Sequence, residues 1–252
     1  TTPLQDAIAA AHGIACINTL TGFKWIGNKL ALYENKLKDA LAKEGLAIDY
    51  DNLSATKRRE LLLKHARFYV FGGEESYGYL GCDSVRDKDG NAATLMLAEL
   101  LARRAAKGQG LKEALDELYL KYGAYAEGAL SLTFEGASGA LKIKKLLRSY
   151  ADNPPKNIGD FVVRSKRDFS KETIIDLDGQ EIPKSTVLFF ELDDGTSFAL
   201  RPSGTEPNVR FYCFTKEAVR EPADLQNAVK RANEKLESLK AALKIDAETR
   251  SA

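Results

Sequence analysis

The chain has 252 residues, of which 44% are hydrophobic and 29% charged, and its 37 basic side chains nearly balance its 36 acidic ones. This length allows one large or two ordinary domains, and the balanced charge argues against a general nucleic-acid binder, which needs an excess of Lys and Arg. No apolar run approaches membrane-spanning length, and the odd, widely spaced Cys16, Cys82 and Cys213 predict reduced thiols in a cytoplasmic protein rather than a disulfide framework or a zinc site.

The first half of the chain alternates short apolar runs with helical periodicity. Residues 14–20 are predicted to be a buried strand, and residues 67–71 a second strand that ends at Gly72-Gly73. Apolar side chains at helical spacing predict helices over residues 30–41, 93–101 and 111–122. Strands that alternate with helices predict an α/β domain with a mixed or parallel sheet.

The pattern changes near Gly123. A strand is predicted over residues 129–134 and a helix over 143–150, followed by three or four closely spaced strands and a long helix over 225–243. Turn signals at Asp178-Gly179 and Asp194-Gly195 join the strands. The second half is therefore predicted to be an α+β domain, with a mostly antiparallel sheet covered by two helices, and we place the domains at 1–123 and 124–252.

The first candidate loop, residues 21–27, places Lys24 and the single tryptophan, Trp25, between a predicted strand and a predicted helix. Loops at strand ends are the usual place for ligand-binding groups in α/β sheets. The competing interpretation is a turn with an aromatic anchor and a solvated lysine.

The second candidate loop, residues 72–79, contains Gly73, Glu74 and Ser76. Glycines allow a tight turn, carboxylates accept hydrogen bonds from vicinal sugar hydroxyls, and serine can donate or accept. No His or further Asp lies at metal-ligand spacing, so sugar recognition is favoured over a metal site. A Gly-rich turn with solvated glutamates stays open as the simpler interpretation.

The third candidate loop, residues 201–210, contains Arg201, Ser203, Gly204, Thr205 and Arg210. Backbone N–H groups and hydroxyls in a tight loop can form a concave nest that binds anions, and an arginine at each end can hold phosphate oxygens bidentately. The alternative is a Pro-Gly hairpin with two exposed arginines. Phosphate binding is the favoured interpretation.

Together, and in this order, the three loops resemble those of the phosphohexomutases, the family of phosphoglucomutase and phosphomannomutase. Members of that family have four domains around a central cleft. Residues 73–76 match the sugar loop of domain three, and residues 201–207 match the phosphate loop of domain four; residues 87–90 also fit the family. By this resemblance the chain comprises most of domain three, without its first strand, and all of domain four.

The resemblance also implies roles for individual residues. Lys24 matches a basic position implicated in acid–base work or in contact with the sugar phosphate, and Gly73, Glu74 and Ser76 match the sugar-binding positions. The residues that match the phosphate-contacting positions are Arg201, Ser203, Gly204, Thr205 and Arg210. The implied partners are a small phosphosugar and the family's domains one and two, with neither nucleic acid nor membrane.

Two family motifs are absent from this sequence, the nucleophile loop of Thr-Ala-Ser-His-Asn-Pro type and the magnesium loop with three closely spaced aspartates. We therefore expect that Mg²⁺ serves the full-length enzyme through ligands outside this chain, and that the isolated chain is inactive. The sequence leaves open whether the sugar is glucose, mannose or a pentose, the last being the substrate class of phosphopentomutases. A noncatalytic phosphosugar-binding module is the alternative from another functional class.

Overall fold

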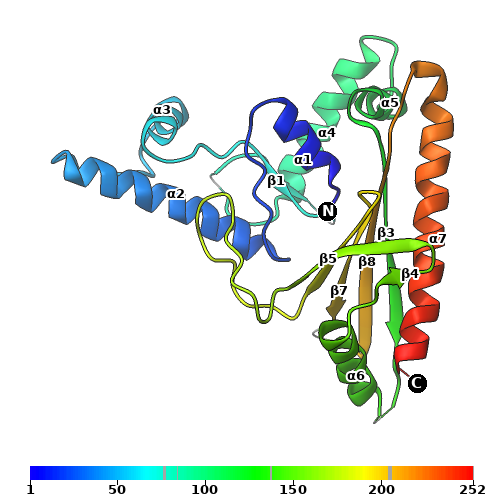
Figure 1. Cartoon of the computed structure of the whole chain (residues 1–252). Helices are drawn as coiled ribbons and strands as arrows, with labels where there is room; N and C mark the ends of the chain where they lie inside the picture. Colours follow the sequence, from blue (N-terminus) through cyan, green and yellow to red (C-terminus); the bar gives the residue numbers. More distant parts are fainter. Residues whose placement is uncertain (76–77, 84, 137, 204–205, 252) are drawn as a thin grey trace. The chain divides into compact units, whose positions relative to one another are not determined.

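The computed structural model describes residues 1–75, 78–83, 85–136, 138–203 and 206–251. The chain divides into two compact units (Figure 1). Thr1 and Thr19–Gly110 make up the first unit, and Thr2–Asn18 together with Leu111–Ala252 make up the second. Each unit has its own cluster of buried apolar side chains.

The first unit consists mainly of helices. Its elements are α2 (Phe23–Lys43), α3 (Ala55–His65), β1 (Gly72–Gly73), β2 (Tyr79–Leu80) and α4 (Gly90–Ala105). The predicted apolar face of α2 is confirmed, because Leu30, Tyr33, Leu37 and Leu41 are all buried. Leu30 packs with Phe23 and Leu80, so the start of α2 and strand β2 share one core.

The two strands predicted in the first half, residues 14–20 and 67–71, are wrong as regular elements. Both segments are irregular, and the only ladder among the described residues of the first unit is the antiparallel pair of β1 and β2. A strand is stabilised by hydrogen bonds to a neighbouring strand, and neither segment pairs with another one in the described part of the chain. Ile14, Val70 and Phe71 accordingly remain exposed.

The second unit is built around an antiparallel sheet in the order β3-β8-β7-β6-β5-β4. The strands are β3 (Ala124–Thr133), β4 (Asn157–Ile158), β5 (Phe161–Asp168), β6 (Leu188–Leu192), β7 (Ser197–Pro202) and β8 (Asn208–Glu217). The helical elements are α1 (Leu4–Ala11), α5 (Leu111–Tyr122), α6 (Gly139–Asp152), η1 (Pro222–Asp224) and α7 (Leu225–Ser251). Figure 1 shows α6 and α7 beside this sheet, as predicted for the second half.

The core of the second unit lies between the sheet and these two helices. The rings of Phe190 and Phe198 stack with centroids 4.6 Å apart, and the Tyr150 ring from α6 meets the Phe211 ring edge-on at 5.9 Å. The Tyr150 hydroxyl donates a hydrogen bond of 2.5 Å to Asp246 of α7, which satisfies its polar end. Alternate residues of β7 and β8 thus face this core, and the residues between them face away.

The hairpin between β6 and β7 forms where Asp194-Gly195 predicted a turn. Gly195 has a φ of 78°, a conformation that side chains with a Cβ rarely adopt. The Asp194 carboxylate accepts a hydrogen bond of 2.9 Å from the Thr196 amide and closes the turn. The α/β fold class, with a mostly antiparallel sheet covered by two helices in the second half, is confirmed.

The division into compact units places α5 with the second half of the chain. The Tyr119 hydroxyl of α5 donates to the Tyr125 carbonyl of β3 at 3.1 Å, and α1 packs against α5. The assignment of residues 1–123 and 124–252 to two domains of the family stays a prediction. In the part of the chain that the structure describes, no helix has the length and hydrophobicity required to cross a membrane.

Candidate functional site

Glu74 is held from two sides in the first unit. The Gly22 amide donates a hydrogen bond of 2.6 Å to one carboxylate oxygen, and Lys88 Nζ lies 2.9 Å from the other. The Glu74 side chain is only 15% exposed, so both contacts are partly shielded from bulk water. The predicted loops at residues 21–27 and 72–79 are therefore adjacent at Glu74.

Lys88 is a site residue that the sequence analysis missed. Its ammonium group also lies 5.4 Å from the centroid of the Phe23 ring, in the first turn of α2. Residues 87–90, which fit the family, lead into α4, where Asp89 accepts a hydrogen bond from the Ala92 amide at 2.8 Å. This capping signal is local, and no local pattern shows that Lys88 reaches back to Glu74.

Gly73 lies in a crowded part of the loop at residues 72–79. It pairs with Tyr79 across the β1–β2 ladder, and a Cβ added to Gly73 would lie 2.8 Å from the Tyr79 ring. The Phe71 ring packs against the same tyrosine with centroids 5.6 Å apart. Only glycine fits at position 73 without a shift of Tyr79, which explains the residue type. Ser76 lies outside the described residues.

Lys24 lies in the first turn of α2, two residues after the Gly22 amide that binds Glu74. Its side chain is exposed, and Nζ lies over the Trp25 ring at 4.9 Å from the centroid. Such a cation–π contact orients the lysine side chain while leaving its ammonium group accessible. The catalytic role expected for Lys24 stays a prediction.

Arg201 and Arg210 lie opposite each other in the second unit, as Cα partners on β7 and β8. Residues paired in this way project from the same face of a sheet, and like charges in that position repel each other. This is the face away from the core, because Leu200 and Phe211 are fully buried on the other face. A bound anion would relieve the repulsion between the two guanidinium groups.

The loop between these arginines is closed by its own hydrogen bonds. The Ser203 amide donates to the Asn208 carbonyl at 2.9 Å, and the Ser203 hydroxyl accepts from the Glu206 amide at 3.2 Å. Glu206 in turn accepts from Asn208 Nδ2 at 2.6 Å and lies 3.8 Å from the Arg210 guanidinium. Gly204 and Thr205 lie outside the described residues. Glu206 and Asn208 are loop residues whose contacts no sequence motif indicated.

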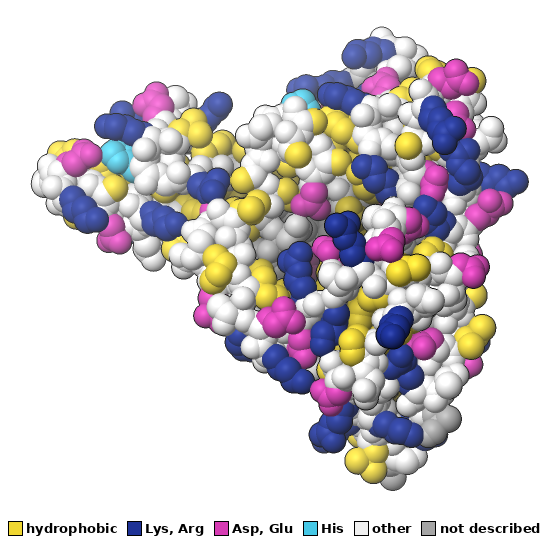
Figure 2. All heavy atoms as spheres, in the orientation of Figure 1, with side chains coloured by type: hydrophobic (Ala, Val, Ile, Leu, Met, Phe, Trp, Pro, Cys, Tyr) yellow, Lys and Arg dark blue, Asp and Glu magenta, His cyan; other side chains and the backbone are white. Residues whose placement is uncertain are grey.

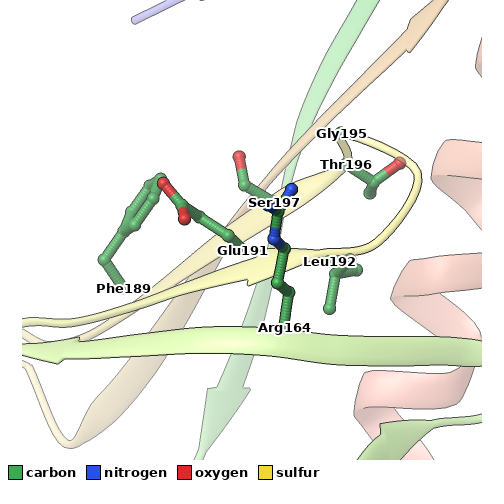
Figure 3. A pocket seen from close by; sticks show the side chains of 7 residues that line it. All are labelled: Arg164, Phe189, Glu191, Leu192, Gly195, Thr196 and Ser197. Atoms are coloured by element: carbon green, nitrogen blue, oxygen red, sulfur yellow. The ribbon is translucent and has the colours of Figure 1, made fainter.

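A cavity of about 280 Å³ lies on the sheet of the second unit (Figure 3). Its lining residues are Arg164, Phe189, Glu191, Leu192, Gly195, Thr196 and Ser197. Figure 3 shows Arg164 reaching from β5 toward Ser197. Glu191 accepts a hydrogen bond of 2.7 Å from the Ser165 hydroxyl and lies 3.4 Å from the Arg167 guanidinium. None of the predicted site residues lines this cavity.

Charges of both signs are interspersed over the face of the molecule that Figure 2 shows. This distribution agrees with the formal net charge of +1 for the whole chain. Within the described residues, no group of three or more His, Cys, Asp or Glu side chains is arranged to hold a metal ion. The polar groups gathered at Glu74 and at the arginine pair are instead suited to binding hydroxyls and anions.

Comparison with known proteins gives one consistent result. The sequence profile of "Phosphoglucomutase/phosphomannomutase, alpha/beta/alpha domain III" matches residues 59–122. A phosphoglucomutase of Staphylococcus aureus (strain bovine RF122 / ET3-1) is 28% identical over 218 residues, which is 84% of this chain and 34% of that protein. A phosphoglucomutase of strain MSSA476 is 27% identical over the same length. The chain thus spans about a third of the length of these curated relatives.

Among solved structures, the chain is similar to the open form of pp63/parafusin from Paramecium, which is described as a phosphoglucomutase. The TM-score is 0.56 at 20% sequence identity, and the match covers 97% of this chain and 37% of that one. At this identity the similarity shows a shared fold.

Proposed function

Because the chain belongs to the phosphoglucomutase/phosphomannomutase family, we propose that it is the sugar- and phosphate-binding part of a phosphosugar mutase. The longer enzyme would interconvert hexose 1-phosphate and hexose 6-phosphate. The observation that carries this proposal is the pairing of Arg201 with Arg210 on adjacent strands of a chain with these relatives. Two guanidinium groups on one face can both donate hydrogen bonds to a single phosphate dianion.

In the proposed reaction, a phosphoserine in another part of the enzyme gives its phosphoryl group to the free hydroxyl of the sugar phosphate. The resulting bisphosphorylated sugar turns around, and its other phosphoryl group returns to the serine. Arg201 and Arg210, with Ser203, Gly204 and Thr205, would hold the phosphate that is not reacting. Glu74 and Ser76, together with the backbone at Gly73, would bind sugar hydroxyls in either orientation.

Lys24 would act beside the sugar loop, either in proton transfer or in contact with the sugar phosphate. Its exposed ammonium group follows directly after the Gly22 turn that contacts Glu74. Lys88, which forms an ion pair with Glu74, would hold that carboxylate in position to accept hydrogen bonds from hydroxyls.

Magnesium would belong to the longer enzyme rather than to this chain. The described residues here do not offer a metal-ligand set, and Glu74 has its two oxygens engaged by Gly22 and Lys88. The metal's ligands, the phosphoserine and the remaining domains are proposed to lie in the other part of the polypeptide. A cytoplasmic location and the absence of nucleic-acid or membrane partners stay predictions from composition.

Two alternatives remain as proposals of lower rank. A phosphopentomutase of the same family would use the same arginine pair, because pentose and hexose phosphates present the same phosphate and vicinal hydroxyls. A noncatalytic phosphosugar-binding module would also need only the groups described here. Turnover by the longer protein separates the three functions. The favoured function predicts conversion of a hexose 1-phosphate, a phosphopentomutase would convert a pentose 1-phosphate, and a binding module would convert neither.

Replacing Glu74 with glutamine tests the sugar-binding role. In the full-length enzyme, Glu74→Gln should lower kcat/KM by about tenfold, because a neutral amide loses part of the strength of a charged hydrogen-bond acceptor. Magnesium affinity, measured by calorimetry, should not change. The neighbouring Glu75→Gln is the matched control, since the Glu75 side chain is 59% exposed. Loss of magnesium binding in Glu74→Gln would disprove the assignment.

A further inference from the structure

The segment that carries Lys88 is tied to α2 by Arg86. The Arg86 guanidinium forms an ion pair with Glu34 of α2, and the Glu34 side chain is only 12% exposed. The backbone of the two segments also approaches closely, because a Cβ added to Gly27 of α2 would lie 3.0 Å from the Arg86 carbonyl oxygen. The contact between Arg86 and α2 thus involves both side chain and backbone.

The charges in this ion pair are strongly favoured. Burial alone would raise the pKa of Glu34, but hydrogen bonds from Lys38 and Arg86 outweigh it and hold the pKa below its ordinary value. Burial would likewise lower the pKa of Arg86, and its hydrogen bond to Glu34 raises it instead. Both groups therefore remain charged at neutral pH, and the pair persists.

A second set of contacts fixes the chain at Asp83, upstream of Arg86 and Lys88. Asp83 accepts a hydrogen bond of 3.0 Å from the Tyr50 hydroxyl and lies 3.3 Å from the Arg58 guanidinium of α3. The Arg58 guanidinium also lies over the Tyr50 ring, 5.2 Å from its centroid. Positions 83 and 86 are therefore both fixed to the helices, just before the chain reaches Lys88.

These contacts close a ring that begins and ends on α2. From Glu34 the ring passes to Arg86, two residues along the chain to Lys88, across the ion pair to Glu74, and through the hydrogen bond to the Gly22 amide at the start of α2. A ring of this kind restricts the position of Glu74 more than its two direct contacts alone would. The reason is that the backbone that carries Lys88 is itself held by the contacts of Arg86 with α2.

We propose that Arg86 is a positioning residue for sugar recognition: its ion pair with Glu34 fixes Lys88, and Lys88 holds the Glu74 carboxylate in place. The proposal rests on the sugar-binding role proposed for Glu74. The contacts themselves can be tested without sugar, so a failure of the ring is distinguishable from a failure of that role.

The test is amide hydrogen exchange in the 252-residue chain, followed by NMR at Gly22. In Arg86→Gln the Gly22 amide should exchange about two- to fivefold faster, the range expected for loss of a partly exposed ion pair. Lys88→Met, which removes the direct contact, should accelerate it by at least as much. Arg86→Lys should restore part of the protection, because lysine keeps the charge but not the guanidinium geometry.

The experiment includes a control variant and a reporter amide. Glu60→Gln is the matched control, since it breaks the exposed pair of Glu60 with Lys57 in the same unit, 3.3 Å long, and should leave Gly22 unchanged. The Leu37 amide reports the integrity of α2. Parental exchange at Gly22 in Arg86→Gln would overturn the proposal. Equal acceleration at Gly22 and Leu37 would also overturn it, because the pair would then stabilise the whole unit rather than position Glu74.

Discussion

Replacing Arg210 with alanine is expected to weaken binding of a sugar phosphate to the full-length enzyme by about tenfold to a hundredfold, since a charge-assisted hydrogen bond contributes about 1.5–3 kcal/mol. Arg210 lies directly opposite Arg201, so each guanidinium can bind one side of the same phosphate. Arg210→Lys should restore only part of the affinity, because lysine lacks the bidentate fork. Calorimetry with glucose 6-phosphate measures the effect.

The fold should survive this substitution, because the Arg210 side chain is 48% exposed and its contact with Glu206 is long, at 3.8 Å. Arg167→Ala is the matched control. Arg167 lies on β5 of the same sheet, is 50% exposed and also faces a carboxylate, that of Glu191. Unchanged affinity in a folded Arg210→Ala variant would mean that the loop is a hairpin with two exposed arginines.

Replacing Phe211 with alanine should lower the free energy of unfolding of the second unit by about 3–5 kcal/mol, the range for truncating a buried aromatic side chain. Phe211 is fully buried on β8, the strand that carries Arg210 on its other face. Its ring contacts that of Tyr150 at 5.9 Å and that of Phe198 at 6.5 Å. The cavity left behind would therefore open in the centre of the core.

Urea unfolding followed by circular dichroism measures this change. Ile245→Ala on α7 is the control, because Ile245 is 67% exposed and its truncation should change stability little. The single tryptophan, Trp25, belongs to the first unit and gives a separate fluorescence signal for that unit. A loss of less than about 1 kcal/mol in Phe211→Ala would contradict the packing described here.

Helices and hairpins were the parts of the fold that the sequence predicted well. The apolar face of α2, with Leu30, Tyr33 and Leu37, repeats at helical spacing over many turns, and such a signal is local. The same holds for the turn at Gly195, whose residue type matches its positive φ. The alternation of Arg210 with Phe211 also predicted correctly which of the two faces the core.

The irregular segments at residues 14–20 and 67–71 show that the composition of a segment does not by itself predict a strand. An apolar run has the composition of a strand whether or not a neighbouring strand is present to pair with it, and pairing is a property of the fold. The predictions therefore failed where regular structure depends on a distant partner.

The contacts that organise the candidate site are of the same non-local kind. Lys88 reaches Glu74, and Arg86 reaches Glu34, over separations that no sequence period links. The sequence indicated Glu74 and the arginine pair by residue type, but the groups that hold them could be found only from the structure. The roles of Lys24, Ser76, Gly204 and Thr205 remain predictions.

The central claim is that this chain is part of a phosphosugar mutase, and the most direct measurement is a mutase assay of the full-length polypeptide with glucose, mannose and ribose 1-phosphates in turn. We expect conversion of a hexose 1-phosphate to the 6-phosphate, and no conversion above the blank by the isolated 252-residue chain. If the full-length protein binds these sugar phosphates but converts none of them, the claim is contradicted and a noncatalytic binding module takes its place.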